Sequence, residues 1–488
     1  MNPFIIIFYC YALFSVSQGN LFDRFKDTLT DIERFGFEML YKDPASRSLY
    51  EFLDLDVEPC DNFYKFTCGN WIKTMEKNRE NSERFNYDIK RANFDKLIKE
   101  TMEGKYNNES SAIKKIYNLR KKCMELSEQA KENCIIKIES LGKYAFTSLF
   151  IKKSRIDSDT HDDYIIIEDI IKRIKDEFRL LIDERENIFD KDSRDNLLQK
   201  LNEIKLKKKF ELHDTYSFLL METCYKNIGI SGNEDIEEAL KNIESLSKMN
   251  YSEGSCGRKI FQPHEYVLNY AHQNVEYHFV LNKLRISPNA LEEPWFNRYF
   301  PQSLNYGNIG SVIANAILNA FNSNHYKYIY GLDKKGNVIL TSESIKNFEK
   351  KSDCFVKQYG AQIERITGQN VNGSLTLAEN IADNGGLKIA HRAFMKYLQV
   401  TGGEEAKVPG FESFTSEQLF FISFGRTFCE HKSKSSLEDQ INKDKHAPGE
   451  IRTIIALSNY KPFSNAFKCK LNTTMNPEHK CEVWKIQK

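Results

Sequence analysis

The sequence predicts a mainly α-helical protein with a small β component, built from one helical lobe and one mixed lobe. Two observations support this: apolar residues recur at helical spacing in the first half, and proline- and glycine-punctuated segments begin after residue 286. Hydrophobic residues make up 41% of the 488 residues and charged residues 28%, which is enough apolar surface for a large core. A disordered chain and a small disulfide-held scaffold are therefore excluded.

The N-terminal segment, residues 1–19, has no charged side chain and contains one nearly unbroken apolar run. That run is shorter than the roughly 20 residues that cross a bilayer, and Ser17 and Gly19 suit a signal-peptidase site. We expect a signal peptide here, a secreted extracellular protein, and a lead-in over residues 20–56. The alternative is an uncleaved anchor at residues 4–16, which would leave an extracellular ectodomain on a membrane.

The cysteines also fit export. Of the 11 cysteines, Cys10 lies in the expected signal peptide, and the even number that remains fits five disulfides. Sequons permit glycosylation at four sites, Asn108, Asn250, Asn372 and Asn472. Lys+Arg total 70 and Asp+Glu total 69, so the chain lacks the excess of basic residues that would indicate a nucleic-acid partner.

Residues 57–285 form the expected helical lobe. Apolar residues at steps of three and four predict amphipathic helices over residues 167–181 and 236–246. Asn233 or Asp235 would cap the second helix.

Residues 286–488 form the expected mixed lobe, which opens with three prolines. An apolar helix rich in small residues is predicted from Gly307 through Phe321. A second helix, over residues 375–393, is predicted to be interrupted at Gly385-Gly386. Short elements separated by glycine and proline follow to the end of the chain.

Five motifs occur in order: CDNFYKFTCGNW at 60–71, SLNYG at 303–307, NGSLTLAENIADNGGL at 372–387, DKHAP at 444–448 followed by Arg452, and MNP with CEVW at 475–484. Together they resemble the neprilysin-like zinc metallopeptidases, the family of neprilysin and endothelin-converting enzyme. The resemblance covers about residues 57–105 and 286–488. It implies a two-lobed neprilysin-like fold, in which a shortened helical N-terminal lobe precedes a thermolysin-like C-terminal lobe.

The resemblance also implies how the cysteines pair. In the family pattern Cys60 pairs with Cys469, Cys68 with Cys429, Cys123 with Cys256 and Cys354 with Cys481, which leaves Cys134 with Cys224. The first two pairs would fasten the N-terminal motif to the C-terminal lobe. Closing such long loops removes unfolded-state entropy worth roughly 4–5 kcal/mol each in the simple chain model.

The zinc-binding helix is the point at which this chain departs from the family. The family needs His-Glu-x-x-His, in which two histidines hold Zn²⁺ and the glutamate is the general base. This chain has Asn315, Ala316 and Asn319 at those positions. By resemblance, Glu379 matches the third ligand and Asp383 the carboxylate that orients a histidine. We expect no zinc cofactor and no intact catalytic residue, because amides are poor zinc donors and alanine carries no proton.

The remaining polar groups at this site are expected to form a hydrogen-bonded cluster, and the alternative is a weak cation site with oxygen ligands. His446 matches the family's transition-state stabiliser and Arg452 a residue that contacts substrate, so both would be vestigial or structural here. Arg84 resembles a residue near the substrate pocket, with a surface arginine as the alternative. Neither His264 nor His325 has the spacing that would replace the lost ligands.

The edge strand that pairs with substrate in the family carries an Asn-Ala-aromatic motif. The nearest match, Pro288-Asn289-Ala290-Leu291, aligns better with a later proline-rich segment of the family. From this spacing the substrate-pairing strand is expected to be deleted.

These observations favour a secreted, catalytically inactive neprilysin-like protein that binds a peptide or an extracellular protein partner. The enzyme alternative is an active secreted zinc metalloendopeptidase that cleaves small peptides with rearranged metal ligands. A structural secreted glycoprotein is the third hypothesis.

Overall fold

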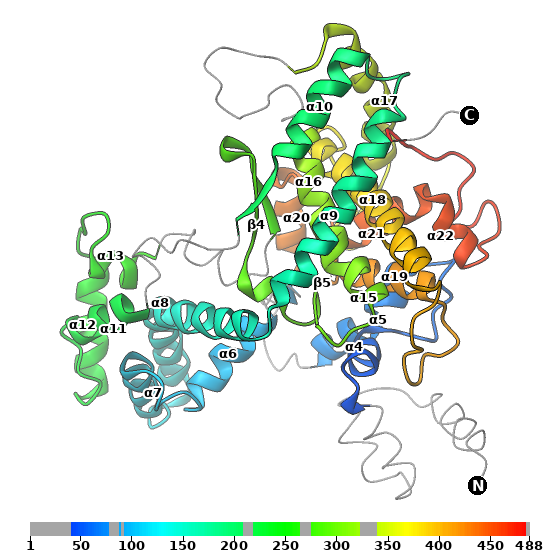
Figure 1. The fold of residues 1–488 in the computed structure, drawn as a ribbon. Coiled ribbons are helices and arrows are strands. Elements are labelled where there is room, and N and C mark those ends of the chain that lie inside the picture. Colours follow the sequence, from blue (N-terminus) through cyan, green and yellow to red (C-terminus); the bar gives the residue numbers. More distant parts are fainter. Residues whose placement is uncertain are drawn as a thin grey trace, which may run out of the picture.

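The computed structural model describes residues 41–77, 87–88, 92–207, 218–263, 275–322 and 339–484 (Figure 1). The expected signal peptide lies outside these residues, as do Arg84, His264 and His325. The described chain is mainly helical and carries a few short strands, which confirms the predicted fold class. No helix in the described ranges combines the length and the apolar character that a bilayer crossing requires.

A large body holds the main hydrophobic core, which extends from Ala45 to Trp484. Its helices come from both ends of the chain: α4 (Pro44–Phe52), α5 (Phe63–Lys77), α9 (Asp163–Asp183), α10 (Lys191–Glu203), α15 (Gln302–Asn305), α16 (Ser311–Leu318), α17 (Ser342–Gly360), α18 (Leu377–Thr401), α19 (Ser416–Arg426), α20 (Lys434–Lys443), α21 (Gly449–Asn459) and α22 (Lys461–Ala466).

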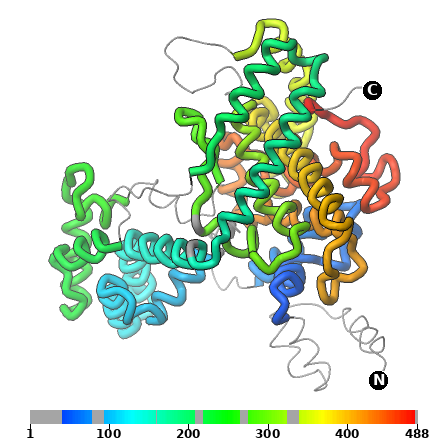
Figure 2. The backbone as a smooth tube through the Cα atoms, viewed as in Figure 1, coloured from blue at the N-terminus to red at the C-terminus, as the bar shows by residue number. Residues whose placement is uncertain are grey.

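A smaller group of helices projects from this body and has a separate core. It consists of α6 (Ala92–Met102), α7 (Ser111–Cys123), α8 (Glu128–Thr160), α11 (Phe218–Lys226), α12 (Ile236–Ser247) and α13 (Cys256–Phe261). The tube in Figure 2 shows α8 running back to the body, where the chain passes into α9. The larger core thus crosses the expected lobe boundary at residues 285 and 286, because the apolar face of α9 packs against α18.

The predicted helices are confirmed over residues 167–181, within α9, and over residues 236–246, within α12. Asp235 caps α12, since its side chain accepts a hydrogen bond from the backbone N–H of Glu237. The predicted interruption at Gly385-Gly386 is wrong, because α18 runs through both glycines without a break.

The strands form two small sheets. Strand β1 (Tyr87–Asp88) pairs antiparallel with β5 (Glu430–His431). In the other sheet, whose order is β2-β4-β3, β4 (Lys283–Ile286) lies between β2 (Lys205–Lys207), which is parallel to it, and β3 (Val275–His278), which is antiparallel to it. Strand β3 is therefore an edge of the described sheet, and it contacts α16.

Three of the disulfide pairings that the resemblance implied are confirmed: Cys60–Cys469, Cys68–Cys429 and Cys354–Cys481.

The pairings Cys123–Cys256 and Cys134–Cys224 are wrong, because the structure joins Cys123 to Cys134 and Cys224 to Cys256. Helix α7 ends at Cys123, and the chain reverses into α8, which brings the two Cα atoms to 5.7 Å. Helices α11 and α13 pack together, which leaves the other pair 5.0 Å apart. Both distances suit a disulfide, and each bond joins neighbouring helices within the smaller group.

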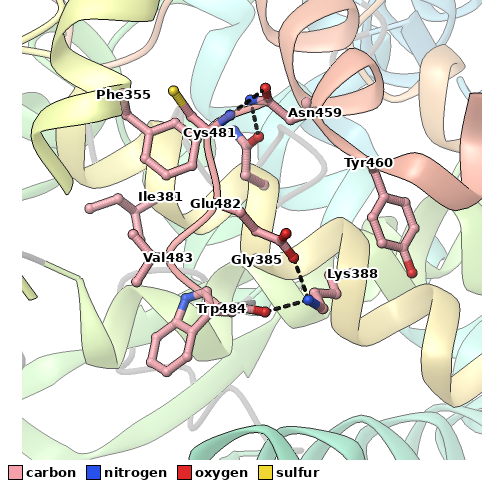
Figure 3. Close-up of a pocket in the computed structure, with 12 residues that line it drawn as sticks. Phe355, Ile381, Gly385, Lys388, Asn459, Tyr460, Cys481, Glu482, Val483 and Trp484 are labelled. Atoms are coloured by element: carbon pink, nitrogen blue, oxygen red, sulfur yellow. Dashed lines mark hydrogen bonds and ion pairs between the residues drawn. The ribbon is translucent and has the colours of Figure 1, made fainter. Parts of the chain in front are cut away.

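The C-terminal segment Cys481–Trp484 lies against α18 and α21 (Figure 3). Lys388 of α18 donates hydrogen bonds to the Glu482 carboxylate and to the Trp484 carbonyl oxygen. The side-chain oxygen of Asn459 accepts a hydrogen bond of 3.0 Å from the backbone N–H of Cys481. The segment is thus fixed by polar contacts at both of its ends.

Candidate functional site

Helices α16 and α18 pack closely and position the candidate site. A Cβ atom on Gly386 would lie 2.8 Å from the backbone nitrogen of Asn315, and one on Gly385 would lie 2.2 Å from a methyl of Leu318. Neither distance is possible for a real side chain, so the two glycines are what allow the helices to approach. This contact brings the polar face of α16 onto the first two turns of α18.

The side chains at the former histidine positions join the carboxylates of α18 in one hydrogen-bonded cluster. The Asn315 amide nitrogen donates to Asp383 Oδ1 at 2.7 Å. The Asn319 amide nitrogen donates to Asn315 Oδ1 at 3.2 Å and to Glu379 Oε2 at 3.4 Å. The expected polar cluster is therefore confirmed.

Asp383 is paired with a cation. The guanidinium of Arg452 donates two hydrogen bonds to this carboxylate, at 2.7 Å from Nε and 2.8 Å from Nη2, and packs 4.5 Å from the Phe428 ring centre. Burial would lower the pKa of Arg452, but the charge of Asp383 outweighs it and raises that pKa above its usual range. In the described site Arg452 is therefore paired with a buried carboxylate, that of Asp383.

Glu379 is 3% exposed, and its carboxylate is paired with basic residues other than Arg452. Lys445 Nζ lies 3.0 Å from Oε1, and His446 Nε2 lies 3.5 Å from Oε2. Burial would raise the pKa of the Glu379 carboxyl, but the hydrogen bond and charge of His446 and the charge of Lys445 outweigh it and hold that pKa well below its usual range.

His446 is also held by Asp444, since its Nδ1 lies 2.9 Å from Asp444 Oδ1. Burial would raise the pKa of Asp444, but hydrogen bonds from the ring and backbone N–H of His446 lower it to about 2. The imidazole is therefore placed between two carboxylates, those of Glu379 and Asp444.

This donor set does not fit the zinc ion that the family implies. Ala316 is buried in the apolar core and offers no acid or base. Within the described ranges, the only three His, Cys, Asp or Glu groups close enough to share an ion are Cys354, His479 and Cys481, and both cysteines are in a disulfide. Glu379 alone cannot complete a tetrahedral zinc site.

Beside this helix, where the substrate-pairing strand is expected to be deleted, the described sheet has an edge strand, β3. Its sequence, Val275-Glu276-Tyr277-His278, lacks the family's Asn-Ala-aromatic motif, so a motif search misses it. The buried alternation of Leu284 and Ile286 in its partner strand is the signal that could have located it. Residues Pro288–Leu291 form a 3-10 turn.

Sequence reasoning also gave no role to Lys445, which contacts Glu379 directly. The asparagines of all four sequons are exposed, as glycan attachment requires.

Comparisons with known proteins identify the family of this chain. The sequence pattern of peptidase family M13 matches residues 59–133 and 274–483, together more than half of the chain. Neprilysin-11 of Caenorhabditis elegans is 35% identical over 266 residues, which are 54% of this chain and 30% of that protein. Rat endothelin-converting enzyme 1 is 38% identical over 213 residues, 43% of this chain and 27% of the enzyme. The matched part is thus about a third of these relatives' length.

Solved structures support the fold. A chain of the Haemonchus galactose-containing glycoprotein complex aligns with a TM-score of 0.59 at 17% identity, covering 92% of this chain and 99% of that one. The zinc metalloprotease Zmp1 of Mycobacterium tuberculosis aligns with a TM-score of 0.50 at 21% identity, covering 74% and 52% respectively. With its sequence motifs, its matched regions and this fold, the chain belongs to peptidase family M13, the neprilysin-like metallopeptidases.

Proposed function

We propose that this chain is a secreted, catalytically inactive member of its family that acts by binding a peptide or a protein. The observation that carries the proposal is the replacement of the zinc ligands and the general base by a closed network of amides, an apolar methyl and paired charges.

The loss of chemistry follows from the residues present. Removing a positioned general base alone costs about 10²–10⁴-fold in rate, and Ala316 cannot transfer a proton. His446 is engaged by Glu379 and Asp444, and Arg452 by Asp383. His446 and Arg452 are thus occupied by carboxylates, in place of the transition state and the substrate that they would contact in an enzyme.

The edge strand supports the binding half of the proposal. Extended peptides add to the edges of sheets through backbone hydrogen bonds, which need no particular side-chain motif. Strand β3 is such an edge among the described strands, and it lies against α16, the helix that carries Asn315. A peptide on β3 would run beside the candidate site without being cleaved.

A protein partner is the other form of the proposal. The related chain from Haemonchus belongs to a galactose-containing glycoprotein complex and matches this chain over most of its length. Exposed sequons and disulfides between distant segments suit an extracellular setting for this chain.

Zinc stoichiometry and peptidase activity, measured on one sample of the full chain, test the proposal. We expect no stoichiometric zinc and no peptide cleavage that a chelator abolishes, while a peptide library or an extracellular protein array yields binders. Chelator-sensitive cleavage that Glu379→Ala removes would establish the alternative, an active secreted metalloendopeptidase. A pure structural glycoprotein would bind neither peptides nor proteins.

A further inference from the structure

Lys445 is the only lysine or arginine within ion-pair distance of Glu379 among the residues that the structure describes. We propose that its ammonium group is a built-in counter-ion of Glu379, which closes the site to divalent cations independently of the lost histidines. The inference deepens the proposed function, on which it rests, because it assigns a second barrier to metal binding.

The pairing of charges around the site supports this role. Each carboxylate of the site has a basic partner: Asp383 has Arg452, Asp444 has His446, and Glu379 has Lys445 as well as His446. A divalent cation at Glu379 would have to displace the ammonium and would also lie near the guanidinium behind Asp383. Repulsion between like charges makes such a position unfavourable in a partly buried site.

The backbone around Lys445 is fixed, so the ammonium is aimed at Glu379. Asp444 Oδ1 accepts a hydrogen bond of 2.8 Å from the backbone N–H of His446. Gln440, in the last turns of α20, accepts from the backbone N–H of Asp444 and donates to the carbonyl oxygens of His446 and Ala447. The turn that follows α20 is therefore held on both sides of Lys445.

The alternative is that Lys445 and Glu379 form an ordinary surface ion pair, since the Lys445 side chain is 64% exposed. The Glu379 side chain that receives the ammonium, however, is only 4% exposed. Water and salt screen a charge at such a position less than they screen a surface charge. Because the Lys445 side chain is largely exposed, it can be replaced without leaving a cavity in the core.

The test restores the family's ligands and then varies the lysine. The full chain is prepared with Asn315→His, Ala316→Glu and Asn319→His, alone and combined with Lys445→Met, Lys445→Arg or Lys443→Met. Lys443 is the matched control: it lines a surface pocket together with Lys445, and among the described residues its ion pair is with Asp439 of its own helix. The Kd for Zn²⁺ is measured by competition with a chelating dye, and Co²⁺ spectra report the ligand set.

We expect Lys445→Met to tighten zinc binding by the restored chain about tenfold or more, the scale of one charge interaction at such a site. Lys445→Arg and Lys443→Met should leave the Kd unchanged. Equal affinities with and without Lys445, or an equal gain from Lys443→Met, would overturn the proposal.

A second arm needs no restored ligands and guards against misfolding of the triple variant. Lys445→Met alone should bind Mn²⁺ several-fold more tightly than the native chain, and Glu379→Gln should remove the gain. No change in this arm also overturns the inference. The proposed function fails separately, if the native chain cleaves peptides in a chelator-sensitive way.

Discussion

The large body and the smaller helical group are held together in different ways. In the body, disulfides join segments 409 and 361 residues apart, and the core combines helices from both ends of the chain. In the smaller group, disulfides join cysteines only 11 and 32 residues apart, between helices that are close in the fold. The family motifs lie mainly in the body, where the scaffold persists although the zinc ligands are gone. The scaffold is therefore kept in a chain that has asparagines at both histidine positions.

The largest expected difference between the two regions concerns their disulfides. Replacing Cys60 and Cys469 by serine should lower the free energy of unfolding by roughly 4 kcal/mol, because with Cys68–Cys429 still in place the bond closes a loop of about 50 residues. The same change at Cys123 and Cys134 should cost roughly 3 kcal/mol. Urea unfolding of both double variants measures the difference, and equal losses would contradict the contrast between distant and local linkage.

The buried ion pair of the site gives the next effect. Asp383→Ala leaves the Arg452 guanidinium buried without its carboxylate, so we expect a loss of about 3–5 kcal/mol in the free energy of unfolding. Asp439→Ala is the control, because it removes an exposed pair with Lys443 that is worth at most about 1 kcal/mol. Similar losses for both variants would show that the Asp383 pair does not stabilise the body.

A smaller loss of stability is expected from a change at the close contact between α16 and α18. Gly386→Ala should destabilise the chain by about 1–3 kcal/mol, because the new methyl meets the backbone at Asn315 and cannot be accommodated without a shift. Gly310→Ala is the matched control, since its nearest neighbour would lie at 3.5 Å and alanine favours a helix. Thermal unfolding of both variants checks this, and a neutral Gly386→Ala would mean that the helices are not held so closely.

The smallest effect is a dependence of stability on acid. The pKa of Asp444 is lowered from 3.8 to about 2 in the folded state, and that of Glu379 is also lowered. Their contribution is therefore fully present above about pH 5, which exceeds the ordinary pKa of both carboxyls, and is lost as the pH falls toward the folded-state values. Asp444 is half exposed, so Asp444→Asn should remove less than about 1 kcal/mol of this dependence. Urea unfolding of the native chain and of Asp444→Asn at pH 5, 4 and 3 measures this dependence. If the free energy of unfolding fell equally with pH in both proteins, His446 would not stabilise the Asp444 carboxylate.

The sequence predicted the fold class, the former zinc site and the three disulfides within the body, because family motifs cover those segments. It did not predict the disulfides Cys123–Cys134 and Cys224–Cys256, since the resemblance is loose between residues 105 and 286 and pairing there depends on how the helices pack. Strand β3 was missed because edge strands are made by backbone hydrogen bonds, which leave a weak signature in side chains. Lys445 was missed for a similar reason, since an exposed lysine in a turn gives no sign that its ammonium reaches a buried acid.

The anchored C-terminal segment has a practical consequence for anyone who produces this protein. Trp484 would be 2.9 Å from a Cβ atom on Gly385, so the segment lies directly behind the helix that carries Glu379 and Asp383. A truncation that ends before Cys481 would delete no residue of the candidate site, yet it would remove the support on which that helix rests. Shortened preparations are therefore unsuitable for judging what the intact chain can bind.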